Sequence, residues 1–324
     1  MMKRLLSVVA FLATTMLPGL QANAQSSWPA RPIKLIVPFA PGGSNDILAR
    51  ALATQLSPRL GQPVVIENKG GAGGAIGIDF VAKAQPDGYT LLLVSQSLTS
   101  ITATGKKLPY DAIRDLQPIG EIGTGEYAIV VSNALNVKSL AELIQLARAK
   151  PNSVSYGTSG IGGLNHLGTE LFAQAAKVRL VHIPYKGIGP AFTDLMGGTL
   201  DMAVPSIASV TQHIQSGKMR GLAVTGARRS PLAPDLPTAA EAGLPGFDLE
   251  TWWGLFAPAH LPPSILKRLN QELNAVLALP EMRDLLAREG VTPKPTTPEQ
   301  FAVLVRSDLA RWTKLINERR IEVE

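Results

Sequence analysis

Short apolar segments alternate with amphipathic segments over most of this sequence, and that alternation limits the possible folds more than any other feature. Apolar runs such as 91–94 (LLLV) and 128–131 (AIVV) are typical of strands that are buried on both faces of a sheet. Most of the strand-like runs are followed by a segment whose apolar residues recur every three or four positions, as on one face of a helix. This order predicts an α/β protein with parallel sheets covered by helices on both sides.

The predicted elements follow one another along the chain from residue 33 to residue 316. Ser44 is expected to cap the first helix, which carries Leu48 and Leu52 on its apolar face. Strands are predicted at 33–38, 64–67, 89–95, 128–131, 154–157, 180–184, 202–204 and 222–224. Helices are predicted from 44, at 76–84, 139–149, 164–172, 188–195, 263–277, 281–288 and 298–316, and between the last two strands. The Pro-, Ala- and Gly-rich stretch 228–245 is expected to be an extended connection.

A strand followed by a glycine-rich turn and a helix occurs twice, at 38–48 and at 156–167. This loose repetition suits two α/β lobes of similar build that face each other across a cleft. The length of 324 residues also corresponds to about two domains. We predict that residues 25–125 and 251–324 form the first lobe and that residues 126–250 form the second.

Residues 1–24 predict a secretory signal peptide. Lys3 and Arg4 give a charged start, residues 5–17 form an uncharged apolar run, and Ala22 and Ala24 are the small residues at positions −3 and −1. The run is shorter than the ~20 residues that a membrane-spanning helix needs. We therefore expect cleavage after Ala24 and, in a Gram-negative cell, a periplasmic protein; the alternative is a short buried helix.

Composition excludes several classes of protein. The chain has no cysteine, so disulfides, thiolate metal sites and cysteine nucleophiles are excluded. The four histidines are scattered without metal-ligand spacing, and we expect no metal and no cofactor. A formal charge of +6 is mild and spread out, and aromatic residues make up only 5%, so nucleic-acid binding is not expected.

The segment 38–46 (PFAPGGSND) is the first candidate binding site. A strand ends, two glycines allow a tight turn, and a helix begins, so unpaired backbone N–H groups and the helix dipole can bind an anion. The alternative is an ordinary turn. Asp46 has two interpretations: a first-turn acid that complements the dipole, or a carboxylate that binds an ammonium group of the ligand.

Three further glycine-rich segments lack the motifs of known catalytic or nucleotide sites. Segment 69–77 fails GxGxxG at Ile76, and segment 156–167 lacks the second glycine of a GxSxG elbow because Ile161 stands there. Segment 156–167 nevertheless predicts a second helix N-terminus that could bind an anion, with Ser159 and Asn165 as hydrogen-bonding side chains. Segment 183–191 places Tyr185 and Lys186 at the end of a predicted strand, from which they could reach a cleft. For each of the three segments, the alternative to a binding role is surface exposure or ordinary packing.

These segments, in this order, resemble the receptor family of tripartite tricarboxylate transporters, also called Bug receptors. The resemblance extends over essentially the whole chain after residue 24, and its specificity comes from the ordered set rather than from one motif. The carrying segments are WP at 28–29, RPI at 31–33, PFAPGG at 38–43 with Asp46, AR at 49–50, ENK at 67–69, GAGG at 71–74, PDGYTL at 86–91, YGTSG at 156–160, HL at 166–167, PYKG at 184–187, PA at 190–191, DL at 194–195, GG at 197–198 with Asp201, AVT at 223–225, PT at 237–238 and EAG at 241–243. Gly163 departs from the family, which often has a polar residue there.

The resemblance implies a type II periplasmic binding protein fold, with two α/β lobes and a ligand cleft between them. It implies that the first loop holds one carboxylate of the ligand through backbone groups and that the second-lobe loops hold the other end. The predicted ligand-binding residues are Phe39, Ala40, Gly42, Gly43, Ser44, Asp46, Ser95, Ser159, Gly162, Gly163, Asn165, Tyr185, Lys186 and Pro205. The implied partners are a small carboxylate or amino-acid ligand and the large and small membrane subunits of the transporter, and the receptor is expected to be a monomer.

Two other functions remain as alternatives. The same receptor could signal to a sensor protein instead of a permease. The second alternative is a periplasmic serine hydrolase that uses Ser159 or Ser44 with His166. The sequence does not favour it, because it contains no nucleophile elbow, no metal site and no obvious acid/base pair. We therefore expect a binding protein and no enzymatic activity.

Overall fold

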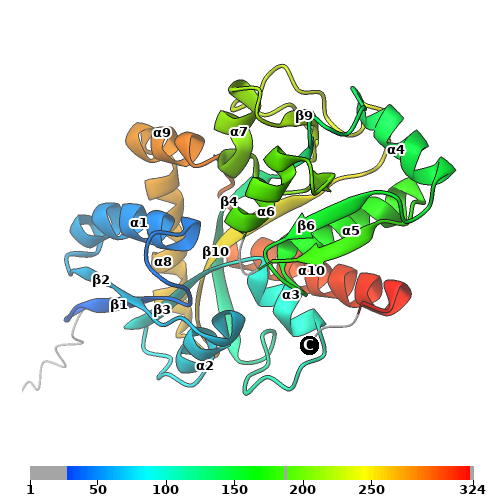
Figure 1. Cartoon of the computed structure of the whole chain (residues 1–324). Coiled ribbons are helices and arrows are strands. Elements are labelled where there is room, and N and C mark those ends of the chain that lie inside the picture. Colours follow the sequence, from blue (N-terminus) through cyan, green and yellow to red (C-terminus); the bar gives the residue numbers. More distant parts are fainter. Residues whose placement is uncertain (1–27, 186–187, 322–324) are drawn as a thin grey trace, which may run out of the picture.

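The computed structural model describes residues 28–185 and 188–321, and within them strands and helices form two sheets with helices on their faces (Figure 1). The predicted signal peptide and Lys186 lie outside the described residues. The strands are β1 (Ile33–Val37), β2 (Val64–Asn68), β3 (Thr90–Ser95), β4 (Leu116–Glu126), β5 (Ala128–Val131), β6 (Ser155–Thr158), β7 (Val181–Pro184), β8 (Met202–Ala203), β9 (Arg220–Val224), β10 (Glu250–Pro258) and β11 (Val291–Pro293).

Helices connect most of these strands, as the apolar periodicity predicts. They are α1 (Ser44–Leu60), the 3₁₀ turn η1 (Ala72–Gly74), α2 (Ala75–Ala82), α3 (Ser97–Ala103), α4 (Leu140–Ala149), α5 (Leu164–Ala176), α6 (Ile188–Gly197), α7 (Ile207–Gln215), α8 (Pro263–Leu277), α9 (Pro280–Arg288) and α10 (Pro298–Arg319). The first helix is capped by Gly43 rather than by Ser44, which is its first helical residue. Gly43 has the extended backbone of a cap, and no side-chain cap is formed there.

The sheets are mixed, which corrects the prediction of parallel sheets. The six-stranded sheet has the order β11-β4-β10-β3-β1-β2, and the five-stranded sheet has the order β7-β6-β8-β5-β9. Strands β1, β2 and β3 are parallel, but β10 runs antiparallel to both β3 and β4. In the second sheet β6 is parallel to β7 and β8, and β5 is antiparallel to β8 and β9. Strand β11 is also antiparallel to β4. Two of the antiparallel strands lie where the chain passes between the sheets: β4 leads into β5, and β10 returns beside β4.

Alternating residues of each strand face opposite sides of the sheet, so every sheet has two apolar cores. On the first sheet Leu91 and Leu93 pack with α1, α8 and α9, whereas Leu92 and Val94 pack with α2, α3 and the start of α10. On the second sheet Ile129 packs with α4 and α5, whereas Val130 packs with α6 and α7. This packing explains why the strands read as continuous apolar runs.

Helix α10 joins the two sheets. Its first part places Phe301 and Val305 in a core of the first sheet, and its last part places Trp312 and Leu315 in a core of the second. Figure 1 shows α10 (red) beside α5 (green), and the two helices are in contact. The end of the chain therefore does not pack with the first sheet alone.

Candidate functional site

Two adjoining cavities lie between the two sheets. The larger, about 930 Å³, is lined by the first loop, α2, α3 and the segment 159–164. The smaller, about 230 Å³, is lined by the first turns of α1, α5 and α7 and by the facing parts of β4 and β10. Leu164 lines both, so the two cavities meet at the first residue of α5.

The first loop connects β1 to α1 and is held to the neighbouring strand β2. The Asn68 side chain donates a hydrogen bond to the Phe39 carbonyl at 3.1 Å, and the Lys69 N–H donates to Val37 at 2.8 Å. Gly42 adopts a φ of 89°, which L-residues rarely adopt, so the turn requires a glycine at that position. The loop therefore presents the start of α1 to the smaller cavity, where Ser44 lies.

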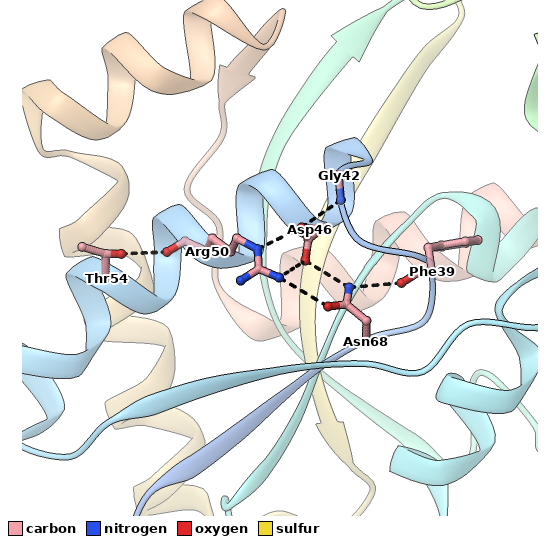
Figure 2. Close-up of polar contacts among 6 residues, drawn as sticks. All are labelled: Phe39, Gly42, Asp46, Arg50, Thr54 and Asn68. Carbon is pink, nitrogen blue, oxygen red and sulfur yellow. Dashed lines mark hydrogen bonds and ion pairs between the residues drawn. The ribbon is translucent and has the colours of Figure 1, made fainter. Parts of the chain in front are cut away.

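Asp46 faces its own lobe, as Figure 2 shows. One carboxylate oxygen accepts hydrogen bonds from Gly42 N–H and Arg50 Nε at 2.9 Å each, and the other accepts from Arg50 Nη2 at 2.9 Å and Asn68 Nδ2 at 3.0 Å. The side chain is buried, and these contacts, with Arg50 first, lower its pKa from 3.8 to about 2. Asp46 therefore ties the first loop to the helix and to β2, and these contacts favour the structural interpretation of this residue.

The second loop connects β6 to α5 and contains two glycines with positive φ, Gly160 and Gly162. The Ser159 hydroxyl donates to Asn165 Oδ1 at 3.2 Å, and Asn165 Nδ2 donates to the Val204 carbonyl at 2.9 Å. Gly163 is the N-cap of α5 and supplies no side-chain oxygen. Ser159 and Asn165 thus lie at the helix start, as predicted from the sequence.

His166 serves as a support for this loop. Its Nδ1 accepts a hydrogen bond from Gly162 N–H at 3.0 Å, and its ring stacks on His182 with centroids 3.9 Å apart. Burial lowers the pKa of both imidazoles, that of His182 to about 4. His166 is therefore neutral at pH 7 and bonded to the loop backbone, whereas the Ser159 hydroxyl is bonded to Asn165. The Ser–His pair of a hydrolase is not formed by these described residues.

The remaining predicted residues divide between the cavities and their surroundings. Phe39, Ser159, Gly162 and Gly163 line the larger cavity, and Ser44, Ser95, Asn165 and Pro205 line the smaller one. Of the described residues predicted for the site, those outside both linings are Ala40, Gly42, Gly43, Asp46 and Tyr185. The Tyr185 hydroxyl donates to Asp194 at 2.7 Å, and this contact directs it along α6.

Sequence reasoning missed three parts of the site. The first turn of α7, residues 206–209, lines the smaller cavity. Glu126 and Glu289 also line it, and burial raises the pKa of Glu126. Lys106 and Lys107 line the larger cavity. The serines at 206 and 209 were the available sequence signal for a third helix start.

The smaller cavity brings together three helix N-termini, and the charged side chains of its described lining are the two glutamates Glu126 and Glu289. The N-terminal turns of α1, α5 and α7 meet there, and Ser44, Ser95 and Asn165 add hydroxyl and amide groups. Among the described residues that line it there is no lysine and no arginine. Helix N-termini offer unpaired N–H groups and a partial positive charge, which suit a carboxylate.

Neither a cluster of metal-ligating side chains nor a helix suited to cross a membrane is found among the described residues. No group of three or more His, Asp or Glu residues in 28–185 and 188–321 could hold a metal ion. None of the helices described combines the length and the apolar character that a membrane span needs.

Two α/β units with a cleft between them, lined by helix starts, define a solute-binding protein of the periplasmic type. The family described as "Tripartite tricarboxylate transporter family receptor" matches residues 48–321. Protein BugT of Bordetella pertussis is 39% identical over 321 residues, which are 98% of this chain and 98% of that protein. The chain therefore belongs to the tripartite tricarboxylate transporter receptor family, whose members are substrate-binding receptors and not enzymes.

Solved structures agree with the fold. The structure described as "R. palustris Rpa4515 with adipate" has a TM-score of 0.77 and 35% identity, and the match covers 90% of this chain and 97% of that one. MatC from Rhodopseudomonas palustris with bound malate has a TM-score of 0.75 and 30% identity, and covers 89% and 99%. The prediction of a type II periplasmic binding protein-like α/β fold is confirmed.

Proposed function

We propose that this receptor captures a small carboxylate in the cleft between its sheets and delivers it to the membrane subunits of a tripartite tricarboxylate transporter. The observation that carries the proposal is the meeting of the N-terminal turns of α1, α5 and α7 at one cavity. The relatives whose structures contain adipate and malate support a carboxylate as the ligand.

Binding would use both lobes. Ser44 and Ser95 come from the first sheet and its helices, whereas Asn165 and Pro205 come from the second. Each helix terminus contributes only ~0.3–1 kcal/mol, whereas micromolar affinity needs about −8 kcal/mol. Several hydrogen bonds in a closed cleft must supply the rest. Closure of lobe 25–125 plus 251–324 onto lobe 126–250, with α10 in contact with both sheets, would present the loaded receptor to its partner.

We also propose that the mature receptor is a periplasmic monomer that begins at Gln25. The charged start, the short apolar run and the Ala22–Ala24 site support processing of the first 24 residues. Intact mass of material from the periplasm should correspond to residues 25–324. Retention of Met1 in that material would contradict the proposed cleavage.

Calorimetry with dicarboxylates tests the binding proposal. Asn165→Ala removes a polar group from the cavity and should weaken binding, whereas Asn133→Ala, an exposed asparagine that bonds to Gly217, should not. No heat and no thermal shift with any di- or tricarboxylate would contradict carboxylate capture.

Uptake by vesicles that contain the cognate membrane subunits tests delivery. Transport should require both the receptor and the ligand. Tight binding without uptake would instead favour the signalling alternative.

A further inference from the structure

We propose that the larger cavity binds the apolar body of the ligand, so that this receptor selects an acid whose two carboxylates are separated by an apolar chain or ring. The inference rests on the proposed function and specifies the ligand class of that same cleft. Short hydroxylated dicarboxylates would leave this cavity empty. The cavity is about four times the volume of the one that the helix starts form, about 930 Å³ against about 230 Å³.

The walls of the larger cavity carry exposed apolar side chains from both sides of the cleft. Ile76 on α2 is 56% exposed, and Ile161 on the second loop is 41% exposed. Phe39, Ile101 and Leu108 are partly buried and line the same cavity. Contact between large apolar side chains and water is unfavourable. An apolar ligand body that covers them would recover part of this free energy.

The glycine-rich turn that precedes α2 shapes this wall. A Cβ atom on Gly71 would lie 2.6 Å from Ile76 Cδ1, one on Gly73 would lie 3.0 Å from Ile101 Cδ1, and one on Gly74 would lie 3.2 Å from Phe39 Cζ. Apolar side chains therefore pack directly against backbone that has no side chains of its own. The segment 69–77, which matches no nucleotide motif, is accounted for as the base of the apolar wall.

The charges of the larger cavity suit a second carboxylate at the far end of the ligand. Lys106 and Lys107 line it in the segment between α3 and β4. Asp79 is the one acidic residue among the described lining, and it pairs with Lys83 at 2.7 Å. The lining is therefore net positive, whereas the described lining of the smaller cavity has two glutamates and no basic side chain. One carboxylate would lie at the helix starts, the apolar body beyond Leu164, and the other carboxylate near the lysines.

Calorimetry with a series of acids tests this assignment. Adipate, suberate and terephthalate should each bind at least tenfold more tightly than malate, a difference of about 1.4 kcal/mol. Ile76→Ser and Ile161→Ser should each weaken the long acids about fivefold and change malate by less than twofold. Ile113→Ser removes an exposed isoleucine, 37% exposed, that is outside the cavity lining and serves as the matched control.

The lysines are tested with the double variant Lys106→Gln/Lys107→Gln. It should weaken adipate about tenfold and leave hexanoate, which lacks the second carboxylate, within twofold. Equal or tighter binding of malate, or equal losses for all acids in the isoleucine variants, would overturn the inference while leaving carboxylate capture intact. Failure of every acid to bind would overturn the proposed function itself, which makes the two failures distinguishable.

Discussion

Replacing Asp46 by asparagine separates the two roles that its position in the first loop allows. In the folded chain the carboxylate accepts four hydrogen bonds, two of them from Arg50, one from Gly42 and one from Asn68. An asparagine retains one oxygen as an acceptor, and its amide nitrogen would face donors where the second carboxylate oxygen was. The substitution therefore removes the ion pair and leaves donors of the loop and of Arg50 without an acceptor.

The size of the effect follows from the pKa of Asp46. A fall from 3.8 to about 2 favours the ionised form in the folded state; at ~1.4 kcal/mol per unit this is worth roughly 2 kcal/mol. The Arg50 side chain is 56% exposed, so solvent screening reduces the ion-pair share. We expect Asp46→Asn to lower the free energy of unfolding by about 1–2 kcal/mol at pH 7. Because the folded pKa is depressed, this difference is present above pH 4 and disappears as the pH falls through about 2.

The assay combines urea unfolding with calorimetry on glutamate and its deaminated analogue glutarate. Since Asp46 bonds to its own lobe, the variant should weaken both ligands by the same factor, about threefold or less, through the loosened Gly42 contact. Lys314→Gln, which breaks an exposed i,i+4 pair with Glu318, is the matched control and should cost under ~0.5 kcal/mol. A loss above about tenfold that is confined to glutamate would refute the reasoning and assign Asp46 to an ammonium group.

Three further predictions concern stability. Burial raises the pKa of Glu121 from 4.5 to about 7, so the folded chain loses stability as pH rises through this range. In urea unfolding, Glu121→Gln should raise the free energy of unfolding by about 1–3 kcal/mol at pH 8 and leave it unchanged at pH 4. Equal effects at both pH values would contradict this prediction. The pKa of His182 is lowered from 6.5 to about 4, mainly by burial, so this residue has the opposite pH dependence. At ~1.4 kcal/mol per unit the shift corresponds to at most about 3 kcal/mol of stability, which is lost as pH falls from 6.5 towards 4, and the pH slope of thermal unfolding in that range should be smaller in His182→Gln. Gly77→Ala places a Cβ 2.6 Å from the Lys69 carbonyl oxygen and should lower the free energy of unfolding by at least ~2 kcal/mol. Gly197→Ala adds a Cβ in open space and should leave it unchanged. Equal unfolding midpoints for the two variants would refute the packing argument.

The fold could be predicted where local pattern and packing agree. The bounds of β5 and α8 match the sequence prediction, because their apolar residues pack as their spacing indicates. Strand β4 was missed because Pro118 and its glycines are unusual in strands. A Cβ on Gly123 would lie 2.5 Å from the Thr292 carbonyl, so the close approach of β11 explains a glycine that reads as a turn. These residues form a strand because of tertiary contacts, which the local sequence pattern does not reveal.

The candidate site also has parts that the sequence predicts and parts that it does not. The two helix starts at Ser44 and Leu164 were predictable, because glycine turns before a helix are a local signal. The hydrogen-bond partners of Asp46 were not, because Asn68 is 22 positions away in the sequence. The wall formed by α3 and the segment after it was also missed, since Lys106 and Lys107 carry no motif.

A receptor that binds its ligand through helix N-termini uses groups that every residue possesses. The loop motifs therefore indicate where an anion can bind, but backbone groups alone do not distinguish one carboxylate from another. Discrimination between ligands has to come from side chains that surround the rest of the molecule, and the further inference assigns this role to residues of the larger cavity such as Ile76, Lys106 and Ile161, which come from separate segments of the chain. A substitution at Ile76, Lys106 or Ile161 would leave the sequences of segments 38–46 and 156–160 intact, so under this inference a change of ligand class needs no change in those motifs.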